Sequence, residues 1–424
     1  MRISLHDVRH NQFLRHNAVY LVGSLAVGAL NYLYYPIIGR MLAPDIFGEV
    51  QTLVSLFLQL SIFLSVLGLV TVNVVANYTD PRMRNAVVLE FERLALLISL
   101  GLMAAVVILQ RPLQEFLQFN DAAPFVVLML ALVLNVPFTF RTAFLQGKQL
   151  FAWAAAANLT AAAGKLVFSA ALIAGGLATI GAMFGLVIAQ GLACVLAIVW
   201  TMRAGLHATE RFTVFRLPRM SLLKPELLYG LLVLVGSLVV TVQYSMDIVI
   251  VKHYFDAYTA GLYAGIASVA RILFFATTSF SLVLMSSVRL QSSVAHNQAL
   301  LRRSLLFMCA VSVPALLLFT IAPGPIVGLL MGAQYRPYAS LLPLLSLAIF
   351  AVAVLNLLVA YFLALRRRSV AIVLVAGAVI TYALMLARHS TPRDIIFNLL
   401  IGSLLMLAFI GGWQLSMKKQ KEYV

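Results

Sequence analysis

The dominant pattern along this chain is a series of long apolar runs separated by short polar breaks. Runs of about 20 apolar residues recur from end to end, and each is long enough to cross a bilayer as a helix. The breaks carry ordinary turn chemistry, as in Pro44-Asp45 and Gly175-Gly176. The pattern predicts an all-α polytopic membrane protein with about twelve transmembrane helices. These spans are expected near 18–39, 48–77, 86–110, 122–146, 150–175, 178–202, 226–251, 260–287, 300–330, 338–365, 369–388 and 394–416.

The composition supports a membrane protein. Hydrophobic residues make up 62% of the chain and charged residues only 10%, against about 25% charged residues in soluble domains. A net charge of +16 would suggest nucleic acid in a soluble protein, but here the positive-inside rule accounts for it. With a cytoplasmic N-terminus, the inner loops hold over three times as many Lys and Arg residues as the outer loops. Both termini are therefore predicted to be cytoplasmic, with no nucleic-acid partner.

The longest polar stretch, residues 203–225, falls after six spans and before six more. It is interpreted as a cytoplasmic linker, with a partner-docking or lipid-binding segment as the alternative. The two halves show weak self-similarity, which predicts parallel repeats with a substrate site between them near the membrane midplane. The predicted organisation is a cytoplasmic N-terminal segment (1–17), a six-helix bundle (18–202), the linker (203–225), a second six-helix bundle (226–416) and a basic cytoplasmic tail (417–424).

Three basic residues, Arg141, Lys165 and Arg271, fall inside predicted spans. A cation at the bilayer centre costs about 2.5–3.5 kcal/mol on insertion scales, so it usually has a partner. That partner is another charge, a backbone carbonyl or an anion in a water-filled cavity. Asp247 is the only acid expected well inside a span. The shortage of internal acids predicts a cavity built for a negatively charged passenger.

The surroundings of Lys165 strengthen this hypothesis. Asn158 and Ser169 are placed to share one helix face with it, which predicts a polar stripe that lines a cavity. The alternative is a polar patch packed against another helix. Asn31 in the first span is a further cavity candidate, although amides also join helices to one another.

The other two cations leave more alternatives open. Arg271 can line the cavity, pair with Asp247, or do both. Arg141 lies about six residues from the Gly147 turn, so its side chain can instead reach the headgroup region. Asp247 is either a site for a coupling cation or an internal counter-ion for Arg271 or Lys165.

Several short segments resemble one family. They are RMLAPDIFG at 40–48, the stretch 255–263, the Leu145-Gln146-Gly147 turn, and GAQY at 332–335. Together they resemble bacterial polysaccharide and O-antigen flippases of the multidrug/oligosaccharidyl-lipid/polysaccharide exporter superfamily. The resemblance implies two six-helix bundles facing a central cationic cavity. It also implies alternating access for an undecaprenyl-pyrophosphate-linked glycan in the bacterial inner membrane.

The sequence therefore predicts a flippase for a polyprenyl-pyrophosphate-linked oligosaccharide in the biosynthesis of a surface polysaccharide, either O-antigen or exopolysaccharide. Its predicted partners are the lipid-linked glycan and membrane lipids, with a polysaccharide polymerase or glycosyltransferases of the pathway as further candidates. The predicted cavity residues are Lys165, Arg271, Arg141, Asn158 and Asn31, with Asp247 as coupling group or counter-ion.

Two rival functions remain. One is a drug or small-molecule antiporter of the same superfamily, in which Asp247 would be essential. The other is a membrane glycan polymerase or ligase, which needs a large outer catalytic loop. The sequence has no Gly-rich phosphate loop, nucleophile elbow or Cys cluster, so no enzyme activity, cofactor or metal is predicted. Cys194 and Cys309 are interpreted as small core residues.

Overall fold

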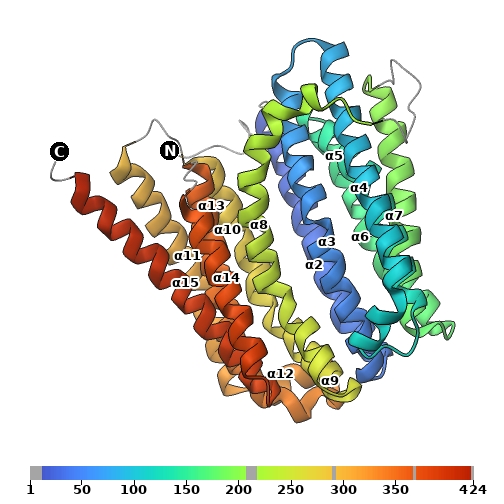
Figure 1. The fold of residues 1–424 in the computed structure, drawn as a ribbon, viewed down its shortest axis with the longest axis vertical. Helices are drawn as coiled ribbons and strands as arrows, with labels where there is room; N and C mark the ends of the chain where they lie inside the picture. The colour runs from blue at the N-terminus through green and yellow to red at the C-terminus, as the bar shows by residue number, and fades with distance from the viewer. Residues whose placement is uncertain (1–11, 207–216, 289–292, 366–368, 422–424) are drawn as a thin grey trace. The chain divides into compact units, whose positions relative to one another are not determined.

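The computed structural model describes residues 12–206, 217–288, 293–365 and 369–421, and within these ranges every regular element is a helix (Figure 1). Eleven helices in the described ranges are long and apolar enough to cross a membrane. The prediction of an all-α polytopic membrane protein is confirmed, and about twelve spans agree with this count. Parts of the predicted N-terminal segment, linker and tail lie outside the described residues.

The helices follow the apolar runs along the chain. In order they are α2 (Gln12–Met41), α3 (Pro44–Asn77), α4 (Pro81–Phe116), α5 (Ala123–Gly147), α6 (Phe151–Ala174), α7 (Ala178–Arg203), α8 (Met220–Tyr254), α9 (Ala257–Ala270), α10 (Ile272–Ser287), α11 (Val294–Ile321), α12 (Pro323–Leu330), the 3-10 helix η1 (Ala333–Leu341), α13 (Leu342–Ala364), α14 (Ser369–Ala387) and α15 (Pro392–Lys421).

Two predicted spans are interrupted. The span expected at 300–330 divides into α11 and α12, because the backbone of Ala322 leaves the helical region (φ −133°, ψ 52°). Ala322 precedes Pro323, and helical dihedral angles are disfavoured for a residue before proline. The span expected at 260–287 divides into α9 and α10 at Arg271. This second break is slight, because the Arg271 amide still donates to the carbonyl of Ala267 at 3.0 Å. Proline therefore ends a helix here, whereas the arginine only marks a junction.

The chain forms two compact units. The first unit comprises Met1–Leu42 and Leu60–Gly230, and the second comprises Ala43–Gln59 and Leu231–Val424. Helix α3 is thus shared, since its first half belongs to the second unit and its second half to the first unit.

The first unit packs through small residues. Helix α6 packs against α2 and α7, and α7 packs against α5. Ala157, Ala193 and Ala197 form a buried cluster with Cys194. Small side chains let membrane helices approach closely and gain van der Waals contact. This packing brings polar positions of α6 close to neighbouring helices.

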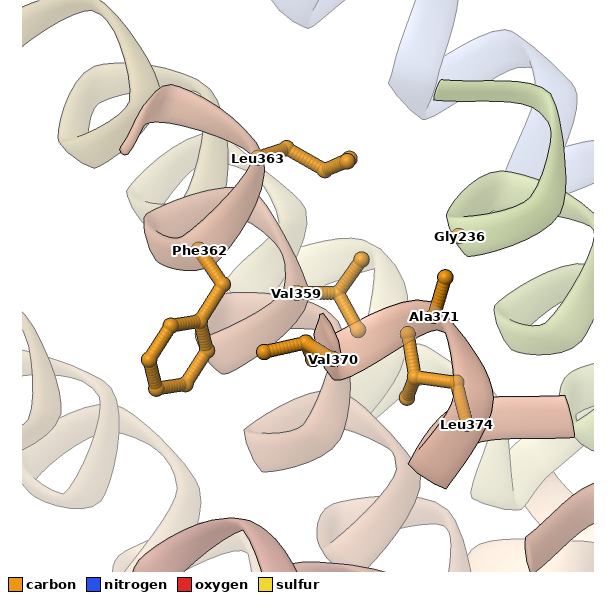
Figure 2. Close-up of a pocket in the computed structure, with 7 residues that line it drawn as sticks. All are labelled: Gly236, Val359, Phe362, Leu363, Val370, Ala371 and Leu374. Carbon is orange, nitrogen blue, oxygen red and sulfur yellow. The ribbon is translucent and has the colours of Figure 1, made fainter. Parts of the chain in front are cut away.

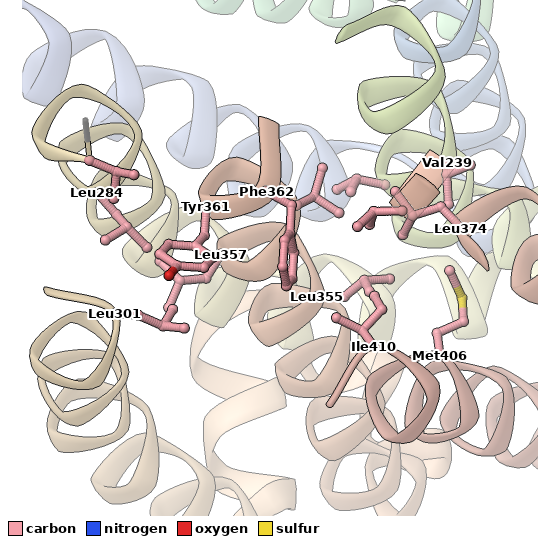
Figure 3. Packing of buried hydrophobic residues seen from close by; sticks show 14 of the residues in the cluster. Val239, Leu284, Leu301, Leu355, Leu357, Tyr361, Phe362, Leu374, Met406 and Ile410 are labelled. Atoms are coloured by element: carbon pink, nitrogen blue, oxygen red, sulfur yellow. The ribbon is translucent and has the colours of Figure 1, made fainter. Parts of the chain in front are cut away.

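The second unit has a conventional apolar core. Its side chains come from α8, α10, α11, α13, α14 and α15, and include Leu301, Leu355 and Met406 (Figure 3). Next to this core, a small pocket lies among α8, α13 and α14 (Figure 2). Apolar residues alone line it: Gly236, Val359, Phe362, Leu363, Val370, Ala371 and Leu374. This pocket therefore offers no polar side chain to a glycan.

Candidate functional site: the cations inside the membrane spans

Lys165 lies in α6 and faces α2. Its ammonium donates a hydrogen bond to Oδ1 of Asn31 at 2.8 Å. The same nitrogen lies 4.4 Å from the ring centroid of Tyr34, within the range of a cation–π contact. Both partners are uncharged, and no carboxylate pairs with Lys165 among the described residues. The ammonium is therefore held in place without being neutralised.

The spacing of two residues on α2 explains why both contact Lys165. Asn31 and Tyr34 are three residues apart on α2, so they project from the same face of the helix. The structure thus brings together two predicted site residues, Lys165 and Asn31. Tyr34 was missed by sequence reasoning. Its position three residues after Asn31 is the signal that points to it.

The predicted polar stripe on α6 divides between three environments. Lys165 contacts α2, whereas the hydroxyl of Ser169 donates to the carbonyl of Ala182 on α7 at 3.0 Å. The amide of Asn158 donates to the carbonyl of Ala154 on its own helix at 2.8 Å. Lys165 is the one charged residue of the three, and its charge is available for another molecule.

Arg141 in α5 has an acidic partner that sequence reasoning missed. Its Nη2 lies 2.9 Å from Oε2 of Glu92 on α4, and only 5% of the Glu92 side chain is exposed. Asp247 is therefore not the only acid that pairs with a cation of the predicted spans among the described residues. Glu92 belongs to a helix that begins at Pro81, and its charge is tolerated because Arg141 offsets it. In the sequence, Glu92 lies next to Glu90 and Arg93, and such a cluster of charges is typical of the end of a span.

Arg271 forms a buried ion pair in the second unit. Its Nη2 lies 2.5 Å from Oδ1 of Asp247, and the two side chains are 6% and 0% exposed. The Tyr263 hydroxyl donates to the other carboxylate oxygen at 2.7 Å, and Arg271 Nε donates to the carbonyl of Tyr244 at 3.1 Å. The counter-ion alternative for Asp247 is thus the one found in this structure.

The three cations therefore differ in kind. Arg141 and Arg271 each form a neutral pair with a buried carboxylate, whereas the partners of Lys165 in the described part of the chain are an amide and an aromatic ring. A cation in a low-dielectric setting without a counter-charge attracts an anion strongly. Among the described residues, no group of His, Cys, Asp and Glu side chains has the arrangement of a metal site.

Comparison with known proteins identifies the family. Residues 13–285 match the model of a family described as polysaccharide biosynthesis protein. The chain belongs to this family. The predicted resemblance to polysaccharide flippases is confirmed at this level. No curated protein matches the sequence.

Several solved structures with the same fold are those of membrane transporters. The lipid II flippase MurJ, in an inward closed conformation, aligns with a TM-score of 0.71 at 11% identity, covering 93% of this chain and 86% of that one. An inward-facing multidrug resistance transporter of the MATE family aligns at 0.67 and 14%, covering 92% and 96%. A transporter of the MOP superfamily from Pyrococcus furiosus aligns at 0.62 and 13%, covering 94% of each chain. At such low identities, these likenesses establish that this polysaccharide biosynthesis family member has the same fold.

Proposed function

We propose that this protein moves a polyprenyl-pyrophosphate-linked oligosaccharide from one leaflet of the bacterial inner membrane to the other, for the biosynthesis of a surface polysaccharide. One observation carries the proposal: the ammonium of Lys165 lies inside a membrane-spanning helix, and its partners among the described residues, Asn31 and Tyr34, are uncharged. Membership of the polysaccharide biosynthesis family and a fold shared with a lipid II flippase support it.

In the proposed mechanism, Lys165 offsets the negative charge of the pyrophosphate during its passage. Two opposite unit charges 4 Å apart attract by roughly 4 kcal/mol at the effective dielectric constant found near protein surfaces, and by more where water is excluded. The hydrogen bond to Asn31 orients the ammonium but leaves its charge free to act on the substrate. The glycan travels in water while the polyprenyl chain stays in lipid, and alternating access exposes the site to each leaflet in turn.

Roles at the substrate for Arg141, Arg271 and Asn158 stay predictions. Each has a partner of its own, so each would have to release that partner to bind an anion. Lys165, Asn31 and Tyr34 are therefore the residues on which the proposal depends.

The two rival functions have weaker support. The antiporter hypothesis gains from the fold shared with multidrug transporters, but it needs Asp247 to bind a coupling cation, and Arg271 and Tyr263 already contact both carboxylate oxygens. A polymerase or ligase needs a large outer loop. The predicted outer connections in the described residues are short, as at residues 117–122 and 255–256.

The proposal is tested with purified protein in liposomes that contain a fluorescent polyprenyl-pyrophosphate oligosaccharide. A membrane-impermeant quencher reports how fast the label changes leaflet. Lys165→Met keeps an unbranched side chain, one atom shorter, but removes its charge, and is expected to slow flipping at least tenfold. Lys165→Arg keeps the charge and should retain a substantial part of the rate.

Thr160→Val on the same helix is the matched control, because the Thr160 hydroxyl bonds only to the carbonyl of Ala156. It should flip at the wild-type rate. A folded Lys165→Met variant with wild-type flipping would refute the assignment of Lys165.

A further inference from the structure

Arg84 lies near the start of α4, in the first unit, and is a buried cation with very weak partners. Only 7% of its surface is exposed. Its Nε and Nη2 both lie 3.4 Å from Oδ1 of Asn85, which is long for a hydrogen bond. Its guanidinium also lies 5.6 Å from the ring centroid of Phe144 on α5. Neither neighbour carries a negative charge.

Another buried arginine of the same unit is neutralised. Arg93, on the same helix, lies 2.7 Å from a carboxylate oxygen of Glu90. The acid nearest to Arg84 in the sequence, Asp80, is exposed and instead accepts the backbone amide of Arg82 as the N-cap of α4. Among the described residues, no carboxylate forms an ion pair with Arg84. A buried guanidinium of this kind is costly unless an anion completes it.

A second cation lies close to Arg84. Lys148 follows the last residue of α5, in the turn that leads to α6. Burial lowers the pKa of the Lys148 ammonium, and the nearby charge of Arg84 lowers it further. No acid opposes these two effects. The backbone amide of Lys148 donates to the carbonyl of Phe144 at 3.0 Å, and Arg84 lies over the ring of the same residue. The fold therefore brings two like charges to the same place, although repulsion disfavours this in the absence of a ligand.

A buried apolar cluster packs beside Arg84 through Phe144. Val75, Val88, Phe144 and Leu206 form a buried cluster at the ends of α3 to α5 and α7. These helix ends are on the predicted cytoplasmic side, where anionic headgroups of the inner leaflet lie. The phosphate of an anionic lipid lies at this level of the membrane, where the two cations can meet its charge.

We propose that Arg84 and Lys148 bind the phosphate of an anionic lipid at the membrane–water interface. A guanidinium can donate two parallel hydrogen bonds to phosphate oxygens, and the ammonium adds a second charge. The lipid is either a phospholipid of the leaflet or a polyprenyl pyrophosphate that waits outside the transport path. The site is separate from Lys165, which lies in the middle of α6, so it does not depend on the proposed function.

Native mass spectrometry of the delipidated protein tests the proposal. The probes are phosphatidylglycerol, polyprenyl pyrophosphate and, as a zwitterionic reference, phosphatidylcholine. The variants are Arg84→Gln and Lys148→Gln. The matched control is Arg82→Gln, because Arg82 is exposed on the same first turn of α4.

Each of the two variants is expected to lower the bound fraction of one anionic lipid about fivefold at limiting concentration, the effect of roughly one interfacial charge. Arg82→Gln should leave it unchanged. A loss confined to phosphatidylglycerol identifies the ligand as a membrane phospholipid, and a loss confined to polyprenyl pyrophosphate identifies the carrier lipid. Either result supports the site.

Wild-type binding of both anionic lipids by both variants overturns the proposal. Equal losses in Arg82→Gln overturn it as well, because the effect would then be a general one of surface charge. Should Arg84→Gln fail to fold, Lys148→Gln decides, since Lys148 is only partly buried in a turn. The flipping rate of Lys165→Met has no effect on this measurement of lipid binding. The proposed lipid site and the proposed flippase function can therefore be refuted separately.

Discussion

The buried pair of Arg271 and Asp247 gives a prediction whose size follows from the structure. Asp247→Asn removes the charge of a carboxylate whose side chain is 0% exposed and leaves the guanidinium 2.5 Å away without a counter-ion. Removing one partner of a buried pair costs about 3–5 kcal/mol. The asparagine oxygen can still accept from Tyr263, so the lower end, about 3 kcal/mol, is expected. That corresponds to roughly a hundredfold change in the unfolding equilibrium.

A double-mutant cycle measures this coupling. Asp247→Asn, Arg271→Met and the double variant are compared by denaturant unfolding in detergent micelles. The double variant should be more stable than Asp247→Asn alone, because no unpaired buried charge remains. The exposed pair of Arg388, which is 71% exposed, and Asp394 is the control, with a coupling of at most about 1 kcal/mol. Additive effects at the buried pair would show that the two charges do not stabilise each other.

Three further predictions concern single sites. Glu92→Gln should destabilise the first unit by up to about 3 kcal/mol, measured by thermal unfolding, because the largely shielded Arg141 loses its counter-ion. Gly185→Ala should lower the melting temperature sharply, since a Cβ would lie 2.3 Å from the backbone nitrogen of Ser169, whereas Gly101→Ala, with open space around it, should not. Asp256→Ala should cost about 1 kcal/mol at neutral pH by removing the N-cap of α9. Hydrogen bonds from Thr259 hold the pKa of Asp256 below its ordinary 3.8. The stabilising effect of this carboxylate is therefore present above pH 4 and fades as the pH falls through the lowered pKa. A loss of stability in Asp256→Ala that is the same at pH 2 as at neutral pH would contradict a role for the ionised carboxylate.

The fold was largely predictable from local properties of the sequence. Spans could be placed because about 20 apolar residues in succession have few alternatives to a membrane helix. The break at Ala322 could not be predicted from the sequence, because the hydropathy pattern does not show which of several prolines ends a helix. Pro314 lies inside α11, whereas Pro323 begins α12.

The candidate site was predictable only in part. The location of Lys165, Arg141 and Arg271 inside spans follows from their positions in apolar runs, and Asn31 is also among the predicted cavity residues. Glu92 was overlooked because it lies among neighbouring charges at the edge of a predicted span. Tyr34 was overlooked because an aromatic residue in a membrane helix is ordinary until a cation is known to face it.

The sequence by itself determined that this protein is an all-helical membrane protein with cations inside its spans. Hydropathy is a property of about 20 consecutive residues, so a span and any cation within it can be recognised without knowing which helices are neighbours. Only the tertiary structure decided which cation remains without a counter-charge. The contacts that settle this join residues 49 positions apart for Arg141 and Glu92, 24 for Arg271 and Asp247 and 134 for Lys165 and Asn31. Electrostatic attraction falls with distance in space, and helix packing sets that distance.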